Sequence, residues 1–172
     1  MNIEEQLLKE HSRINATFIS DYIGTNSIKF DQLMKLFFAN KYILTQRAAY
    51  SVGISIDNHP ELIAPYVETL IDNLENKIHD AVKRNTVRIL EKMDIPESHQ
   101  GILTEKCFQY LMANNEPIAV KAFSMSILFN MVMKYHELKN ELKMVIEDLM
   151  EHGTPAITLR GKKILKALDR VS

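Results

Sequence analysis

Apolar positions along this chain follow the 3.6-residue period of an α-helix, and the same arrangement returns at a nearly constant interval. From Val82 to Leu90 the positions i, i+4, i+7 and i+8 are apolar or small, and they fall on one face of a helix. Equivalent sets begin at Thr45, Val120 and Ile157, so successive sets are 37, 38 and 37 residues apart. We therefore expect the chain to repeat one structural unit four times.

One column of this pattern holds a small residue in every copy: Ala49, Thr86, Ser124 and Gly161. The distance between packed helices depends on the side chains at the contact, so small residues allow close approach. We expect these four residues to lie at helix–helix contacts.

The helix described above is the second helix of each unit. A first helix precedes it and repeats at the same interval of 37 to 38 residues. Its columns hold Leu33, Leu70, Phe108 and Val145, and then Phe37, Leu74, Met112 and Leu149. Two helices in a unit of this length are typical of an α-solenoid, in which each repeat packs on its neighbours. The predicted fold is an all-α superhelix, a right-handed solenoid of about four helical hairpins behind an N-terminal half repeat.

The pattern places all of this in a single domain, residues 1–172. An N-terminal helix within residues 1–24 is expected to run unbroken over 3–23. Its polar outer face would come from Glu4, Glu5, Lys9, Glu10 and Arg13. Repeats follow at about 28–57, 58–94, 96–134 and 136–170. Their eight helices are predicted at 28–39, 41–56, 60–74, 78–92, 98–113, 117–133, 137–151 and 155–170.

The predicted helix 117–133 is apolar on nearly all sides. Besides its repeat columns it carries Phe123, Phe129 and Met133. A helix of this kind is usually interior, buried by both neighbours. The alternative is that these three residues form an exposed apolar strip for a partner or for dimerisation.

Two segments resemble the HEAT (armadillo-type) repeat family, in the small bacterial form. Glu61–Leu70, with Pro65 after its opening turn, is similar to the first helix of a HEAT repeat. Ala81–Leu90, with Lys83 as its basic residue, is similar to the second. The resemblance extends over roughly residues 28–168, although Gln46 and Thr158 replace the basic residue in the outer copies. It implies a fold that often binds proteins or peptides and specifies no activity.

Basic residues recur on the second helices, and the resemblance implies that these helices line a concave side. They are Arg47, Lys83, Arg84, Arg88, Lys121 and Arg160, the last followed by Lys162, Lys163 and Lys166. Such a ladder suits an acidic peptide, and it also suits a phosphate backbone. The third interpretation is a solvated face whose charges pair with Glu75, Glu91 and Asp94.

Net charge, cysteine content and the apolar segments limit which partners and which cellular compartment are expected. The net charge of −1 provides no global field toward nucleic acid or acidic lipid. A single cysteine, Cys107, excludes an internal disulfide and is expected in the core. The acidic N-terminal segment does not resemble a signal peptide, and the apolar stretch at 123–133 is too short to cross a bilayer. We expect a cytoplasmic protein with no membrane contact.

No catalytic or metal-binding motif is visible, and no cofactor is predicted. His79-Asp80 invites comparison with HD phosphohydrolases, but the further His and Asp ligands of that family have no counterparts here. His59, His99 and His136 occupy corresponding turns, about 8–10 Å apart by helix stacking, too far for one zinc ion. No nucleophile motif, glycine-rich phosphate loop or pair of carboxylates on one face is present.

These observations predict a non-enzymatic scaffold that binds a protein or peptide. The alternative is DNA binding, as in the alkylation-repair DNA glycosylases built from HEAT-like repeats, although their sites use Trp and this chain has none. An adenylosuccinate lyase is not expected. That family's loop, Ser-Ser-x-Met-Pro-x-Lys-x-Asn, has no match, since Ser124-Met125-Ser126 lacks the rest of it. The oligomeric state is left open.

Overall fold

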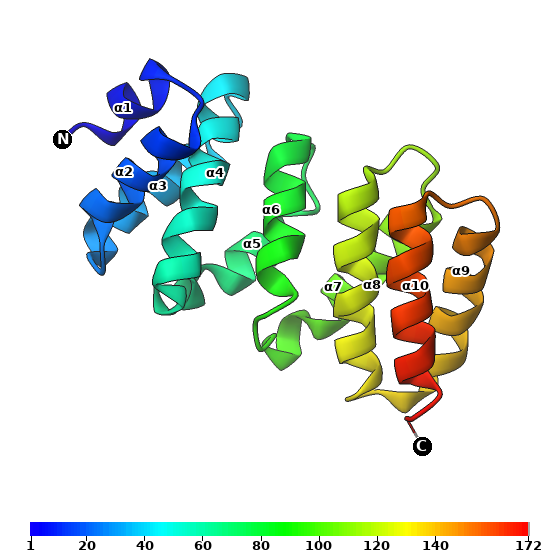
Figure 1. Cartoon of the computed structure of the whole chain (residues 1–172). Helices are drawn as coiled ribbons and strands as arrows, with labels where there is room; N and C mark the ends of the chain where they lie inside the picture. The colour runs from blue at the N-terminus through cyan, green and yellow to red at the C-terminus, as the bar shows by residue number, and fades with distance from the viewer. Residues whose placement is uncertain (172) are drawn as a thin grey trace. The chain divides into compact units, whose positions relative to one another are not determined.

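The computed structural model describes residues 1–171, and every regular element within that range is a helix, as predicted (Figure 1). In chain order the elements are α1 (Ile3–Lys9), α2 (Arg13–Ile23), α3 (Ser27–Phe38), α4 (Tyr42–Asn58), the 3-10 helix η1 (Pro60–Tyr66), α5 (Val67–Asn73), α6 (Asp80–Leu90), α7 (Glu97–Met112), α8 (Ile118–Val132), the 3-10 helix η2 (His136–Leu138), α9 (Lys139–Glu151) and α10 (Pro155–Leu168).

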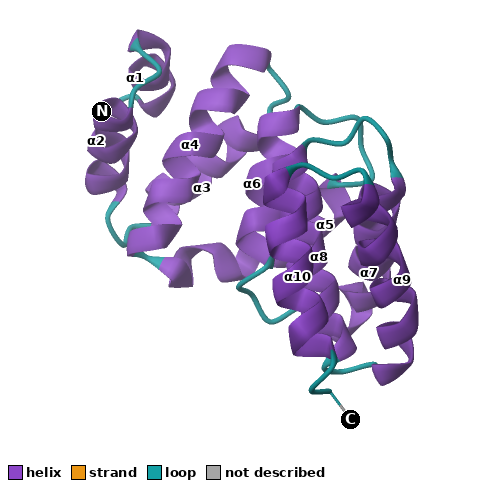
Figure 2. Cartoon of the chain, turned by 45° about the vertical axis from the view of Figure 1, so that its right-hand side comes forward, coloured by secondary structure: helices purple, strands orange, loops and turns teal. Residues whose placement is uncertain are grey.

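The helices gather into two compact units, Met1–Thr86 and the part of the chain from Val87 onward. The division falls within α6. In the first unit α4 packs against both α2 and α3, and in the second α8 packs against α7 and α10 (Figure 2). In α4, α8 and α10 the second helix therefore contacts its own first helix and a neighbouring second-type helix, which is the packing that the repeat pattern predicts.

The small column of the repeat lies in the core of both units. Ala49, Thr86, Ser124 and Gly161 are all buried, as predicted. Gly161 lies so close to α9 that a Cβ atom there would be 2.5 Å from Met150 Sδ and 3.0 Å from Ile146 Cγ2. The spacing between α9 and α10 thus depends on the absence of a side chain at this position.

The first prediction that proved wrong concerns residues 3–23, which form two helices with a break at residues 10–12. Ser12 begins α2 by accepting the N–H of Asn15 at 3.0 Å. The buried Asn15 side chain donates from Nδ2 to the carbonyls of Gln6 (2.9 Å) and Glu10 (3.0 Å). Because this amide satisfies carbonyls that a continuing helix would have used, the broken geometry is stable.

Proline accounts for the irregular start of the second repeat. The predicted helix at 60–74 is a 3-10 helix over Pro60–Tyr66, followed by α5. Pro65 has no N–H to donate and its ring crowds the preceding turn, so the regular α-helix begins only after it. The other predicted helices agree with the structure to within a few residues.

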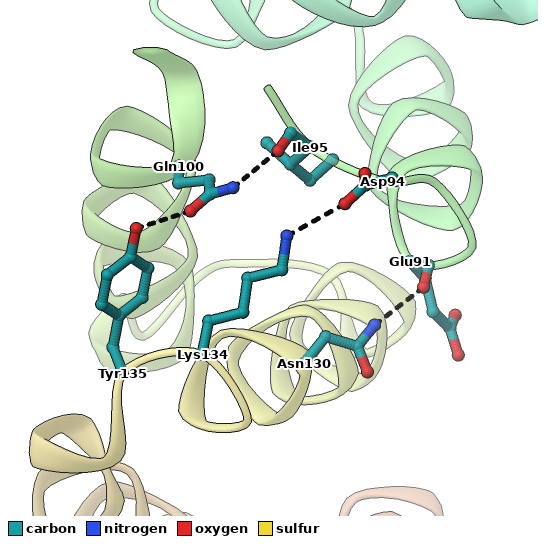
Figure 3. A network of polar contacts seen from close by, with 7 residues as sticks. All are labelled: Glu91, Asp94, Ile95, Gln100, Asn130, Lys134 and Tyr135. Carbon is teal, nitrogen blue, oxygen red and sulfur yellow. Dashed lines mark hydrogen bonds and ion pairs between the residues drawn. The ribbon is translucent and has the colours of Figure 1, made fainter. Parts of the chain in front are cut away.

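Hydrogen bonds and an ion pair join the helix ends of the second unit, most of them between residues about one repeat apart (Figure 3). The hydroxyl of Tyr135 donates to Gln100 Oε1 at 2.7 Å, and Gln100 Nε2 donates to the carbonyl of Ile95 at 2.7 Å. The same segments are joined by Asn130 Nδ2 donating to the Glu91 carbonyl (3.0 Å) and by the Lys134–Asp94 ion pair (2.9 Å).

A tyrosine makes the corresponding connection in the first unit. The hydroxyl of Tyr66 donates to Asp31 Oδ1 at 3.1 Å, and Lys35 pairs with the same carboxylate at 2.7 Å. Hydrogen bonds from Lys35 and Tyr66 lower the pKa of Asp31. Burial, together with the neighbouring Asp31 carboxylate, raises the pKa of Tyr66 to about 12.

The single cysteine is a core residue, as predicted. Cys107 in α7 is buried, and this burial raises the pKa of its thiol to about 12. The thiol therefore stays protonated at neutral pH and acts as a small apolar group.

Glycine substitutions test the close contact between α9 and α10. We expect Gly161→Leu to lower the free energy of unfolding by about 1–3 kcal/mol, because the new side chain overlaps Ile146 and Met150. Gly101→Leu in α7 is the matched control, since a Cβ atom there meets nothing within 4 Å. It should be neutral or stabilising by up to about 1 kcal/mol through helix propensity. Urea unfolding followed by circular dichroism measures both.

The Tyr66–Asp31 hydrogen bond is tested by alkaline titration. The folded pKa of Tyr66 lies above the unfolded value of about 10. The contribution of this phenol to stability is therefore complete below pH of about 10 and is lost as the pH rises toward 12. The step near pH 12 that Tyr66 contributes to the ultraviolet tyrosinate curve should be absent from the curve of Tyr66→Phe. The same step in Tyr42→Phe should persist, and its loss there would contradict this assignment.

Candidate binding surfaces on the second helices

Two of the six predicted ladder cations bind the carboxyl ends of neighbouring helices. Arg47 donates from Nη1 to the carbonyl of Leu7 (2.8 Å), in the last turn of α1, and Lys121 donates from Nζ to the carbonyl of Leu111 (3.2 Å), in the last turn of α7. The final carbonyls of a helix lack partners within it and carry a partial negative charge. Both cations therefore have a structural function, which Lys29 repeats at the Tyr22 carbonyl of α2 (2.9 Å).

Arg160 is held within the second unit by three groups. Its guanidinium donates to Ser126 Oγ at 2.6 Å and lies 3.3 Å from Glu91 Oε1. It also stands 6.0 Å from the centre of the Phe123 ring. The sequence placed Arg160 in the basic ladder and Phe123 in the apolar strip, and the structure brings the two residues together. Glu91 pairs with the Arg160 guanidinium, as expected if the ladder cations are neutralised by nearby acids.

The remaining ladder cations differ in exposure. Lys83 is half-buried and lies 3.7 Å from Asp80, one turn earlier in α6. Arg84 is exposed, and Arg88 is half-buried. Arg47, Lys83 and Arg84 belong to the first unit, and the other three belong to the second. A continuous ladder through all six residues stays a prediction.

One open surface of the second unit lies on α8 and α10, which pack against each other. These helices are related by one repeat of 37 residues, and their matching columns Val120/Ile157, Ser124/Gly161 and Ile127/Ile164 are all buried. Because the buried columns match, the faces opposite them match as well. This opposite side, which we call the α8–α10 face, comprises Ser126, Phe129 and Met133 of α8 with Leu159, Lys163, Lys166 and Arg170 of α10 and the turn that follows it.

The α8–α10 face combines apolar side chains of both helices with cations of α10 and the turn after it. Leu159 is 74% exposed and Met133 is 54% exposed, while Phe129 is half-buried. Lys163, Lys166 and Arg170 are exposed, and none of them has an ion-pair partner within residues 1–171. The predicted apolar strip is therefore divided, since Phe123 lies beside Arg160 and Met133 is open to solvent. Leu159 and Arg170 were not among the predicted site residues. Helical spacing could have revealed them, because they lie four residues before Lys163 and four residues after Lys166.

Residues that could hold a metal ion do not cluster in the part of the chain that the structure describes. No three His, Cys, Asp or Glu side chains within residues 1–171 lie close enough to share a metal ion. His79 begins α6 by accepting the N–H of Ala81 at Nδ1 (3.0 Å), and its ring packs edge-on against Tyr42. A hollow of about 330 Å³ near Lys121, Asp148 and His152 combines both signs of charge but contains no activated nucleophile.

Comparison with known proteins identifies a family and no individual relative. The family model described as HEAT repeat domain matches residues 3–168. Comparison with curated proteins gave no match, and comparison with solved structures gave none either. No helix within residues 1–171 combines the length and the apolar character needed to cross a membrane.

Charge-removing substitutions test whether a cation supports the fold. We expect Arg47→Met to lower the free energy of unfolding by about 1 kcal/mol, because the α1 carbonyl of Leu7 loses its charged donor. Arg84→Met is the matched control on α6 and should change stability by less than about 0.5 kcal/mol, since its side chain is exposed. Equal effects of the two substitutions in urea unfolding would show that capping by Arg47 is unimportant.

Proposed function

This chain belongs to the HEAT repeat family, and we propose that it is a non-enzymatic scaffold that binds a protein or peptide through the α8–α10 face. The main observation in support is that exposed apolar side chains and cations without ion-pair partners within residues 1–171 lie on one side of two packed helices. Leu159 and Met133 provide apolar contact, and Lys163 and Lys166 provide charge. HEAT repeats commonly serve as protein-interaction scaffolds, and this general property supports the proposal.

The chemistry of the face defines the partner. Exposed apolar side chains at the spacing of a helix suit an amphipathic segment whose own apolar residues recur every three or four positions. The cations favour a partner with acidic residues beside its apolar anchors. Such charge pairs raise specificity and the association rate more than they raise affinity. We therefore infer that the ligand is an acidic amphipathic helix of a partner protein. The free thiol of Cys107 is compatible with a reducing compartment such as the cytoplasm.

Nucleic acid is the second candidate, and one observation favours it. Four cations, Lys162, Lys163, Lys166 and Arg170, occur within nine residues and lack ion-pair partners within residues 1–171. Phosphate contacts depend steeply on salt because they release condensed counterions. Apolar anchoring of a peptide depends on salt much less, so salt dependence separates the two functions.

The experiment is a selection of displayed helical peptides on the immobilised protein, followed by titration of the selected peptide. We expect acidic peptides with apolar residues at helical spacing. Leu159→Glu/Met133→Glu should weaken their binding at least about 30-fold, as for the loss of interface anchors. Lys163→Glu/Lys166→Glu should weaken it with a strong effect on the association rate.

The matched control is Met144→Glu/Lys92→Glu, which changes one exposed methionine and one exposed lysine outside the α8–α10 face. It should bind the peptide as the wild type does. If no acidic peptide is selected and a labelled DNA duplex binds with steep salt dependence, the nucleic-acid function is correct. If the control loses as much affinity as the test variants, the α8–α10 face is not the binding site.

A further inference from the structure

The outer side of α2 exposes apolar residues at the N-terminal end of the first unit. Its inner side, with Ile19 and Ile23, is buried, and the helix packs there on α4. On the opposite side Ile14 is 81% exposed and Phe18 is 54% exposed. Of the residues predicted to give this end a polar outer face, Arg13 lies on α2, and Glu4, Glu5, Lys9 and Glu10 lie on α1 or directly after it. This side of α2 is therefore apolar between its charged ends.

Five residues of this outer side line one hollow of about 450 Å³: Arg13, Ile14, Thr17, Phe18 and Asp21. We call them the α2 face. Arg13 and Asp21 are the charged ends of the face, and each stands four residues from Thr17 at its centre. Neither charge has an ion-pair or hydrogen-bond partner within residues 1–171.

Both charges occupy the end of α2 that the helix dipole disfavours. Arg13 is the first residue of α2, where the free N–H groups are partly positive, and Asp21 lies in the last turn, where the free carbonyls are partly negative. Each residue therefore weakens its own helix slightly. Each would be stabilised if it lay beside the opposite end of another helix.

We propose that the α2 face binds the α2 face of a second copy of this chain, with the two helices antiparallel about a twofold axis near Thr17. This arrangement places Arg13 of each copy beside Asp21 of the other, at helix ends of favourable sign. Ile14 and Phe18 then pack against the same pair of the second copy. The half-buried Thr17 is small enough to let the helices approach to about 8–10 Å.

The size of the α2 face determines how strong the association is. The two charges are separated by about 12 Å along the helix, so the contact covers less than the standard area of about 800 Å² per partner. We infer a weak dimer, with a dissociation constant of about 1 μM or above. The proposal does not depend on the α8–α10 face, which lies in the other unit.

Charge exchange between copies tests this geometry. Arg13→Asp brings two acids together at each end of the dimer, and Asp21→Arg brings two bases together. We expect each single variant to sediment as a monomer where the wild type is a dimer. An equal mixture of the two variants should associate again, because a chain with acids at both positions then faces a chain with bases at both. The double variant Arg13→Asp/Asp21→Arg should dimerise by itself.

Stability measurements distinguish lost association from lost folding. Each single substitution improves the fit of α2 to its own dipole, so the monomer should unfold at equal or higher urea concentration. Phe18→Glu should weaken dimerisation at least about 30-fold. Ile28→Glu, at an apolar position outside the α2 face that is 73% exposed, should leave it unchanged. A wild type that is monomeric at all soluble concentrations, or a mixture of the single variants that stays monomeric, would overturn the proposal.

Discussion

Close contact between helices at one column of the repeat constrains most of this structure. Gly161 leaves no room for a Cβ atom beside Met150 and Ile146, and Ala49, Thr86 and Ser124 are buried in the same column. When this side of a second helix faces the core, the side half a turn away must face outward. The small column therefore also determines that Leu159, Lys163 and Lys166 are open to solvent.

Short helices create a second constraint, because each one ends in carbonyls that have no partner within the helix. In this protein Lys29, Arg47 and Lys121 donate to such carbonyls in α2, α1 and α7. A basic residue on a second helix is therefore weak evidence for nucleic-acid binding. Lys162, Lys163, Lys166 and Arg170, which no helix end uses, lie on α10 or directly after it.

The two proposed surfaces follow from the same physical argument, applied to groups that the fold leaves unsatisfied. The α8–α10 face combines cations with exposed apolar side chains, and the α2 face combines apolar side chains with two charges at unfavourable helix ends. In each case the missing partner is defined by chemistry: an acidic amphipathic segment for the first, and a copy of the same face for the second.

The amino-acid sequence by itself determined the all-α fold, the repeat and most of the helix positions after residue 24, because 3.6-residue periodicity and the small column depend on local order along the chain. It did not reveal the break between α1 and α2, since a buried Asn15 amide that bonds to Gln6 and Glu10 is a tertiary arrangement. Tertiary structure also decided which cations bind the carbonyl end of a helix and which stay exposed. Arg47 and Arg84 occupy equivalent positions in the repeat, yet only the first lies beside the end of another helix, 40 residues away in sequence. Distances of this kind are absent from a linear pattern, because they depend on which helix ends the packing brings together.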